Sequence, residues 1–213
     1  MKKVLLIFII GILSVFTANS LLAEVRNNNM QHDMASKIIR FHVIANSDSK
    51  SDQALKLRVR DKILGYIAPK LKNSKNIEES RKILRENNGE MLKIASSEIR
   101  KEGYDYKVDS TLSKVNFPIK TYGNITLPQG KYEAYRIIIG SGQGQNWWCV
   151  MFPPLCFVDI TKGQVSYEKT ENEMKKVLTP EEYKMVDNAS LGLNKRNIKF
   201  KFKILEILKS IGV

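Results

Sequence analysis

Thiol and imidazole groups are the side chains of this 213-residue sequence that could carry nucleophilic chemistry. Cys149 as nucleophile, His42 as base and Asp159 as the orienting group would make a thiol hydrolase, since an imidazole within hydrogen-bond reach generates the thiolate. His42, however, stands between Phe41 and Val43 in a strand pattern, where a structural histidine is far more common. We therefore expect no catalytic residue and no enzymatic activity in this chain.

Metal binding and cysteine pairing are the other uses open to Cys149 and Cys156. Six residues separate them, two of which are prolines, and this spacing differs from that of a zinc knuckle. Because His32 and His42 are the only histidines, we expect neither a metal site nor a cofactor. The oxidising side of a membrane would permit a Cys149–Cys156 disulfide. Two buried free thiols are the alternative, and the sequence leaves both open.

A glycine-rich stretch and a tryptophan pair precede the cysteines. Gly140, Gly142 and Gly144 follow a strand pattern but lead into another strand, without the helix N-terminus that would hold a phosphate group. We interpret them as a hinge or hairpin connection. Trp147 and Trp148 must face opposite sides of any strand, so one can fill the core while the other is available to a partner. The alternative is that both are buried between sheet and helices.

Hydrophobic periodicity predicts the elements that would position these groups. Apolar residues recur every four positions after Ser49 or Ser51, as in a core-facing helix, and Pro69 would stop that helix at Ala68. Three poor helix formers, residues 87–89, would bend or interrupt the next helix. The predicted strands cover residues 38–45, 104–108, 115–119, 131–139 and 147–152, and the predicted helices cover 49–68, 76–102, 171–177, 180–186 and 199–211.

The first twenty or so residues predict export. Met-Lys-Lys precedes an uncharged apolar run, and Ala18 to Ser20 supplies the small residues that suit a signal peptidase. Residues 1–22 therefore form either a cleaved signal peptide or an uncleaved N-terminal anchor, since the apolar stretch of about 20 residues could span a bilayer. In both cases the positive end stays in the cytoplasm and the rest of the chain is exported.

The order of the elements behind this segment predicts an α+β fold, with a mainly antiparallel sheet packed with two long helices. We expect a linker over residues 23–37 and a single compact extracytoplasmic domain over residues 38–213. The formal charge of +13 favours contact with anionic surfaces. Because the lysines are scattered and the domain is exported, we interpret this charge as solubility and expect no nucleic-acid partner. A wall-binding or lipid-binding module is the alternative.

Two sequence blocks resemble the signatures of a known family. The first is FHVIANSDS over residues 41–49, followed by Asp52-Gln53 and by LKLRVRD over 55–61. The second is PxGxYEAxR from Pro128, followed by NWWCVMFPPLCFVD over 146–159. In order and content these blocks resemble stage II sporulation protein R, and they lie behind an N-terminal export segment as in that family.

The resemblance implies a signal rather than an enzyme. Members of this family are made in the forespore of endospore-forming bacteria and are exported into the space between forespore and mother cell. There they trigger a membrane-embedded aspartic protease, which cleaves the precursor of the mother-cell sigma factor, sigma-E. The implied partner of this chain is that protease, with transient membrane association through the N-terminal segment.

A contact surface for this partner is expected where the first turn and the tryptophan strand lie. Tryptophan is enriched among the residues that contribute most to protein interfaces. The loop 141–145 would join this surface. The expected partner-binding residues are Asn46, Asp48, Asp52, Asn146, Trp147 and Trp148.

Overall fold

The computed structural model describes residues 2–157 and 167–190, and the side chains from residue 14 onward except those of 157 and 167. Its helices are α1 (Lys2–Ser36), α2 (Lys50–Leu71), α3 (Ile77–Glu86), α4 (Asn88–Lys101), α5 (Tyr167–Lys175) and α6 (Pro180–Val186). Its strands are β1 (Ile39–Ile44), β2 (Val108–Phe117), β3 (Lys120–Tyr122), β4 (Ile125–Leu127), β5 (Gly130–Ile139) and β6 (Asn146–Phe152), and a short 3-10 helix, η1, covers Leu155–Phe157. The helix predicted over 199–211 lies outside the described residues, as does Asp159.

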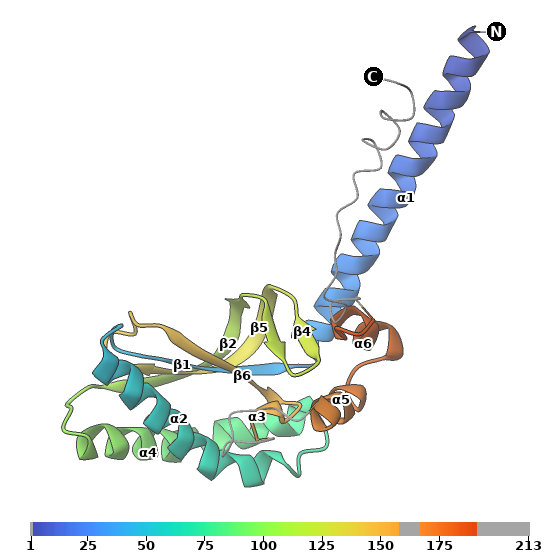
Figure 1. Ribbon diagram of the computed structural model, residues 1–213. Coiled ribbons are helices and arrows are strands. Elements are labelled where there is room, and N and C mark those ends of the chain that lie inside the picture. Colours follow the sequence, from blue (N-terminus) through green and yellow to red (C-terminus); the bar gives the residue numbers. More distant parts are fainter. Residues whose placement is uncertain (1, 158–166, 191–213) are drawn as a thin grey trace.

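A four-stranded sheet in the order β2-β5-β1-β6 forms the centre of the fold (Figure 1). The β2–β5 and β1–β6 pairs are antiparallel, so the expected α+β class with a mainly antiparallel sheet is confirmed. The central pair, β1 and β5, is parallel, which the sequence patterns did not indicate. Parallel neighbours need a long crossover connection, and helices α2 to α4 form part of it here. As a result, the C-terminal ends of β1 and β5 lie side by side.

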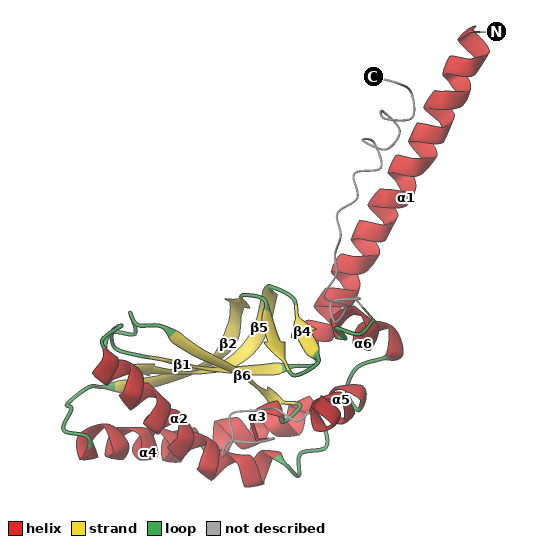
Figure 2. Ribbon diagram, viewed as in Figure 1, coloured by secondary structure: helices red, strands yellow, loops and turns green. Residues whose placement is uncertain are grey.

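Helices α2, α3 and α4 lie over one face of this sheet (Figure 2). Their apolar side chains share a core with Phe41 of β1 and Tyr135 of β5. The first of these helices begins after Ser49, whose Oγ accepts a hydrogen bond from the Asp52 backbone N–H at 3.1 Å. Such a cap satisfies one of the backbone donors that a helix N-terminus leaves unpaired.

Contacts with the rest of the fold explain where α2 and α3 end. The predicted end of α2 at Ala68 is wrong, since the helix continues through Pro69 to Leu71. Leu71 is buried, and its burial offsets the hydrogen bond that a proline nitrogen cannot donate. The predicted interruption at residues 87–89 is confirmed, because α3 and α4 meet at Asn87. The Asn87 Oδ1 accepts a hydrogen bond from the hydroxyl of Tyr66 on α2 at 2.7 Å.

The strand signal between residues 104 and 119 belongs to one strand rather than two. β2 runs from Val108 to Phe117, whereas Tyr104 and Tyr106 precede it and stack with ring centroids 5.2 Å apart. β2 is an edge strand whose central residues are mostly half-buried and polar on both faces. The alternation that marks a half-buried strand is therefore weak in its middle.

A second core lies on the opposite face of the sheet. Met34 at the end of α1 and Ile38 beyond it are fully buried there, together with residues of the β3–β4 hairpin and of α6. The Lys37 Nζ donates to both carboxylate oxygens of Glu182 on α6, each at 2.7 Å. We expected residues 23–37 to be a linker, but all of them except Lys37 belong to helix α1. The end of this segment is docked on the domain through Met34 and Lys37.

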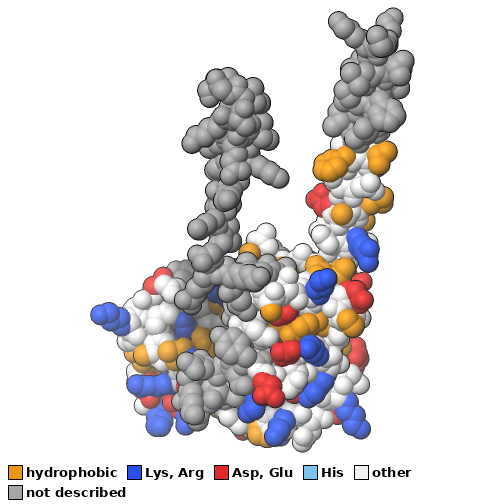
Figure 3. Space-filling view, turned by 45° about the vertical axis from the view of Figure 1, so that its right-hand side comes forward, with side chains coloured by type: hydrophobic (Ala, Val, Ile, Leu, Met, Phe, Trp, Pro, Cys, Tyr) orange, Lys and Arg blue, Asp and Glu red, His pale blue; other side chains and the backbone are white. Residues whose placement is uncertain are grey.

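Helix α1 extends away from the sheet as a long rod (Figure 1). Val15 is 61% exposed and Phe16 is 70% exposed, and Figure 3 shows apolar side chains on the rod clear of the domain. The side chains of residues 1–13, in the predicted signal peptide or anchor, lie outside the description. In the described part of the chain, no helix has both the length and the apolar character that crossing a bilayer requires.

Candidate functional site

The turn after β1 and the loop between β5 and β6 form one hydrogen-bonded unit, which we call the turn–loop junction (residues 46–52 and 140–145). The Asn46 Oδ1 accepts a hydrogen bond from the Ser141 backbone N–H at 2.9 Å, and the Ser141 hydroxyl donates to the Asn46 carbonyl at 2.7 Å. The Asp48 Oδ1 accepts from the Gln145 backbone N–H at 2.7 Å. The parallel β1–β5 pair brings these two segments together, since it places both strand ends at one edge.

Asp52 holds the turn side of this junction in place. Its Oδ2 accepts hydrogen bonds from the Asn46 Nδ2 at 2.9 Å and from the Ser47 hydroxyl at 2.6 Å. Burial by itself would raise the pKa of the Asp52 carboxyl, but these hydrogen bonds outweigh it and the pKa lies below its ordinary value. Asp52 is only 3% exposed and remains a carboxylate, and these hydrogen bonds order the turn.

The spacing of the loop glycines follows from how closely the loop approaches the turn. Gly140 and Gly142 have φ angles of +59° and +63°, which residues with a side chain rarely adopt. A Cβ at Gly140 would overlap the Asn46 Oδ1, and a Cβ at Gly144 would overlap the Ser47 backbone carbonyl. These glycines do connect two strands, but the hairpin interpretation is wrong, because β1 lies between β5 and β6 in the sheet. The glycines are needed because the loop backbone packs closely against the turn.

Lys56 joins the junction from the first turns of α2, and sequence reasoning missed it. The Lys56 side chain is 5% exposed, and its Nζ donates to the Gln145 carbonyl at 2.8 Å. Burial, followed by the charge of Arg60, lowers the pKa of Lys56, while Asp48 opposes this shift. A lysine among the apolar positions of a core-facing helix is the sequence signal that could have indicated a buried amine.

The two tryptophans lie on opposite faces of β6, as predicted, and both are half-buried. On the helix face, the Trp147 ring meets Phe41 edge-on at 5.9 Å, with the Arg60 guanidinium 4.7 Å from its centre. On the other face, the Trp148 ring stacks on His42 with centroids 4.7 Å apart and an interplanar angle of 12°. Each indole therefore packs on the domain with one part and remains accessible with another.

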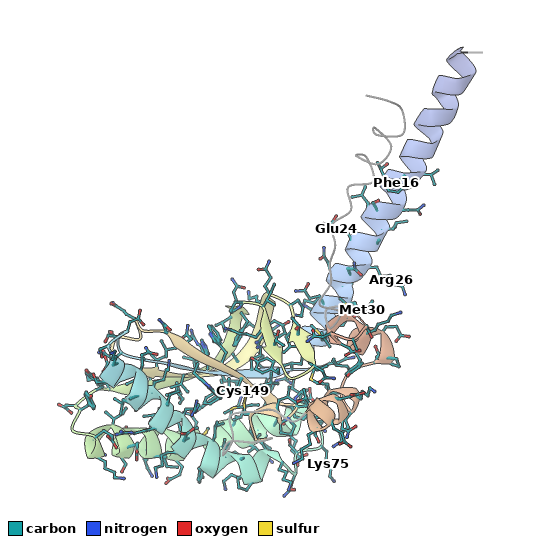
Figure 4. All side chains as sticks on the ribbon, in the orientation of Figure 1. Phe16, Glu24, Arg26, Met30, Lys75 and Cys149 are labelled. Atoms are coloured by element: carbon teal, nitrogen blue, oxygen red, sulfur yellow. A yellow bond between two sulfur atoms is a disulfide. The ribbon has the colours of Figure 1, made fainter. Side chains whose placement is uncertain are left out.

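The thiol and imidazole groups do not meet. Cys149 is bonded to Cys156 in a disulfide, with Cα atoms 5.7 Å apart, and lies in the core between the sheet and the helices (Figure 4). His42 lies on the opposite face of the sheet, because Phe41 is the residue in register with Cys149. Among the described residues, no group of His, Cys, Asp and Glu side chains could hold a metal ion.

His42 is a buried, neutral histidine. Its side chain is 4% exposed, and burial, followed by the charge of Arg136, lowers its pKa to about 4. Asn146, on the neighbouring strand, opposes this shift. At neutral pH the ring is therefore uncharged and serves as a stacking partner for Trp148.

Arg40 is a second buried cation that sequence reasoning missed. It is fully buried, and its Nη2 donates to the Tyr122 hydroxyl at 2.9 Å. Its guanidinium carbon lies 4.2 Å from the Phe117 ring centre and 4.8 Å from that of Tyr132, within range of cation–π attraction. Burial raises the pKa of Tyr132 to about 12, so this neighbour stays neutral. An arginine inside an apolar strand pattern was the available signal.

Together these features define a mixed α/β domain on a long N-terminal helix, with a hydrogen-bonded polar junction beside a strand that carries two half-buried indoles. The family model described as stage II sporulation protein R (spore_II_R) matches residues 35–162, which include the junction and both tryptophans. A curated stage II sporulation protein R from Bacillus subtilis (strain 168) is 39% identical over 154 residues, covering 72% of this chain and 69% of its own. No solved structure matches the chain. The chain thus belongs to the stage II sporulation protein R family.

Proposed function

We propose that this chain is a secreted sporulation signal that activates a membrane-embedded aspartic protease in the space between forespore and mother cell. The protease would then process the precursor of sigma-E. The observation that carries the proposal is the family match over residues 35–162, which covers the sheet, its helices and the junction. A sporulation role follows from the family, and activation by direct contact is the mechanism we propose for it.

Export is supported by the apolar surface of α1. Phe16 and Leu22 are 70% and 68% exposed, and Val25, one turn further on, is 56% exposed. Many exposed apolar side chains on one helix are unfavourable in water and favour contact with a membrane or a protein. A segment of this kind would be embedded in the forespore membrane or removed during export. We therefore propose that the domain works outside the forespore, either released or tethered.

The proposed contact with the protease is made by Trp147 and Trp148 next to the junction. Both indoles are half-buried, which holds them in fixed orientations and lowers the entropy lost on binding. Contact alone would not activate a protease. The domain must bind the active state of the protease more tightly than the inactive state, and so shift its population.

The contact is tested by sigma-E precursor processing in an endospore-forming host that lacks its own family member. Trp147→Ala and Trp148→Ala should each greatly reduce the cleaved fraction of the precursor, measured by immunoblot during sporulation. Ile119→Ala is the matched control, because Ile119 is 60% exposed and lies outside the junction and β6. Normal processing by folded, exported forms of both tryptophan variants would remove the indoles from the contact.

A further inference from the structure

The outer side of β6 is an open strand edge. In the described residues, β1 pairs with one side of β6 and no strand pairs with the other. Such an edge offers a row of N–H and C=O groups that another extended segment can satisfy. Asn146, Trp147 and Trp148 are half-buried, whereas the following residues of β6, Cys149 to Phe152, are buried. The accessible half of the edge is therefore the half that carries both indoles.

Cations flank this accessible half on both faces of the sheet. The Lys120 Nζ lies 5.9 Å from the centre of the Trp148 ring, and the Arg60 guanidinium lies 4.7 Å from that of Trp147. Arg60 is paired with its neighbour Asp61 at 2.7 Å. Lys120 forms no ion pair with any residue that the structure describes, so its charge is available to a partner.

Polar groups without partners lie behind Trp148 on the same face. Within the described residues, no hydrogen bond reaches the Nε and Nη1 of Arg40. The strand register also places Asp109 on this face, but on β2, which is the far edge of the sheet. Arg40 is fully buried and His42 is uncharged, so Lys120 is the cation beside Trp148 that a partner can reach, and a carboxylate of an acidic partner fits its charge.

We propose that the Asn146–Trp148 edge binds an extended, acidic segment of a partner protein as an added fifth strand of the sheet. The partner residue opposite Trp148 would project on the same face as the indole, where a carboxylate can reach Lys120. The proposal rests on the proposed function only for the identity of the partner, the receptor protease. The binding mode itself rests on the open edge, the indoles and the flanking cations.

Hydrogen exchange of the full-length chain in neutral detergent micelles tests the binding mode. The probe is a peptide of about ten alternating glutamate and valine residues, the length of a long strand, at millimolar concentration. Exchange of the outward-facing amides in the first half of β6 should slow roughly tenfold, since these groups become hydrogen-bonded. The corresponding lysine–valine peptide should leave their exchange unchanged.

Charge variants assign the effect to this edge. Lys120→Glu should abolish the protection, and Lys120→Arg should retain it. Lys62→Glu, on the exposed side of α2, should behave like the wild type. Thermal unfolding establishes that each variant is folded. Unchanged exchange of β6 with the acidic peptide, or equal protection by the basic peptide, would overturn the proposal.

Sporulating cells separate this proposal from the proposed function. If Lys120→Glu blocks both peptide protection and sigma-E precursor processing, the added strand is the contact used in signalling. If Lys120→Glu blocks peptide protection while processing stays normal, the edge binds acidic strands but the protease does not use it. If the acidic peptide protects β6 of the wild-type chain, but this chain never supports processing of the sigma-E precursor, the proposed function fails and the binding mode stands.

Discussion

His42 shows how a strand position sets the charge of a side chain. Histidine in an unfolded chain titrates near 6.5, whereas burial and then the Arg136 charge lower the pKa of His42 to about 4 in the fold. Between these values the unfolded state binds the extra proton, so the free energy of unfolding falls as the pH falls from 6.5 toward 4. The total loss is on the order of 3 kcal/mol.

A His42→Phe variant should lose this part of the pH dependence, because its ring cannot be protonated. Urea unfolding of both proteins near neutral pH and again close to the lowered pKa measures the difference. The wild type should lose stability in acid relative to the variant. Equal losses in the two proteins would contradict a histidine that is held neutral by burial.

The close approach of loop and turn makes a second prediction at the residue scale. Gly144→Ala should lower the free energy of unfolding by about 1–3 kcal/mol, because its Cβ would overlap the backbone carbonyl of Ser47. Gly65→Ala is the matched control, since a Cβ at that helical position meets nothing within 4 Å. It should stabilise the protein by about 0.5–1 kcal/mol. Similar denaturation midpoints for the two variants would argue against a tightly packed junction.

At the scale of elements, local sequence patterns predicted most of the individual strands and helices but not how they pair and pack. Periodicity correctly predicted β1, β5, β6 and the break between α3 and α4, because each depends on neighbouring residues. The parallel pairing of β1 with β5 joins segments far apart in the sequence, and no local pattern records that register. The end of α2 was missed because burial of Leu71 outweighs the local effect of Pro69.

The candidate site likewise has residues that the sequence indicated and contacts that it did not. Asn46, Asp48 and the tryptophans were identified as a surface from residue type and resemblance. Asn46 and Asp48 accept hydrogen bonds from the glycine loop. This contact could not be predicted, because it depends on the parallel β1–β5 pair that brings the strand ends together. Arg40 and Lys56 were missed, because a charged residue is expected to be exposed unless tertiary contacts bury it.

The disulfide belongs to the scale of elements, since it joins β6 to η1. Replacing both Cys149 and Cys156 by serine should lower the free energy of unfolding by about 2 kcal/mol, in line with the short loop that the bond closes. Thermal and urea unfolding measure this loss. The variant should still support sigma-E precursor processing at a temperature where it is folded. Loss of processing by a folded form of this variant would contradict a purely stabilising role of the disulfide.

At the scale of the whole molecule, the N-terminal helix, which we propose to be an export segment, is also part of the domain. Met34 is fully buried in the second core, so Met34→Ala should lower the free energy of unfolding by about 2–5 kcal/mol. Val15→Ala, at a position that is 61% exposed, should change it by less than about 0.5 kcal/mol. Equal effects would show that the helix end is not docked. Cleavage near Ser20 would leave this docked end in place, and mass analysis of the exported protein determines whether it occurs.

Crossing the forespore membrane is the central step of the account, and one measurement tests it most directly. The chain is produced in the forespore of an endospore-forming host that lacks its own family member, either intact or without residues 1–22, and the cleaved fraction of the sigma-E precursor is measured by immunoblot. The intact chain should restore cleavage, and the shortened chain, folded but retained inside the forespore, should not. Equal cleavage with both forms would contradict a signal that acts between the two membranes.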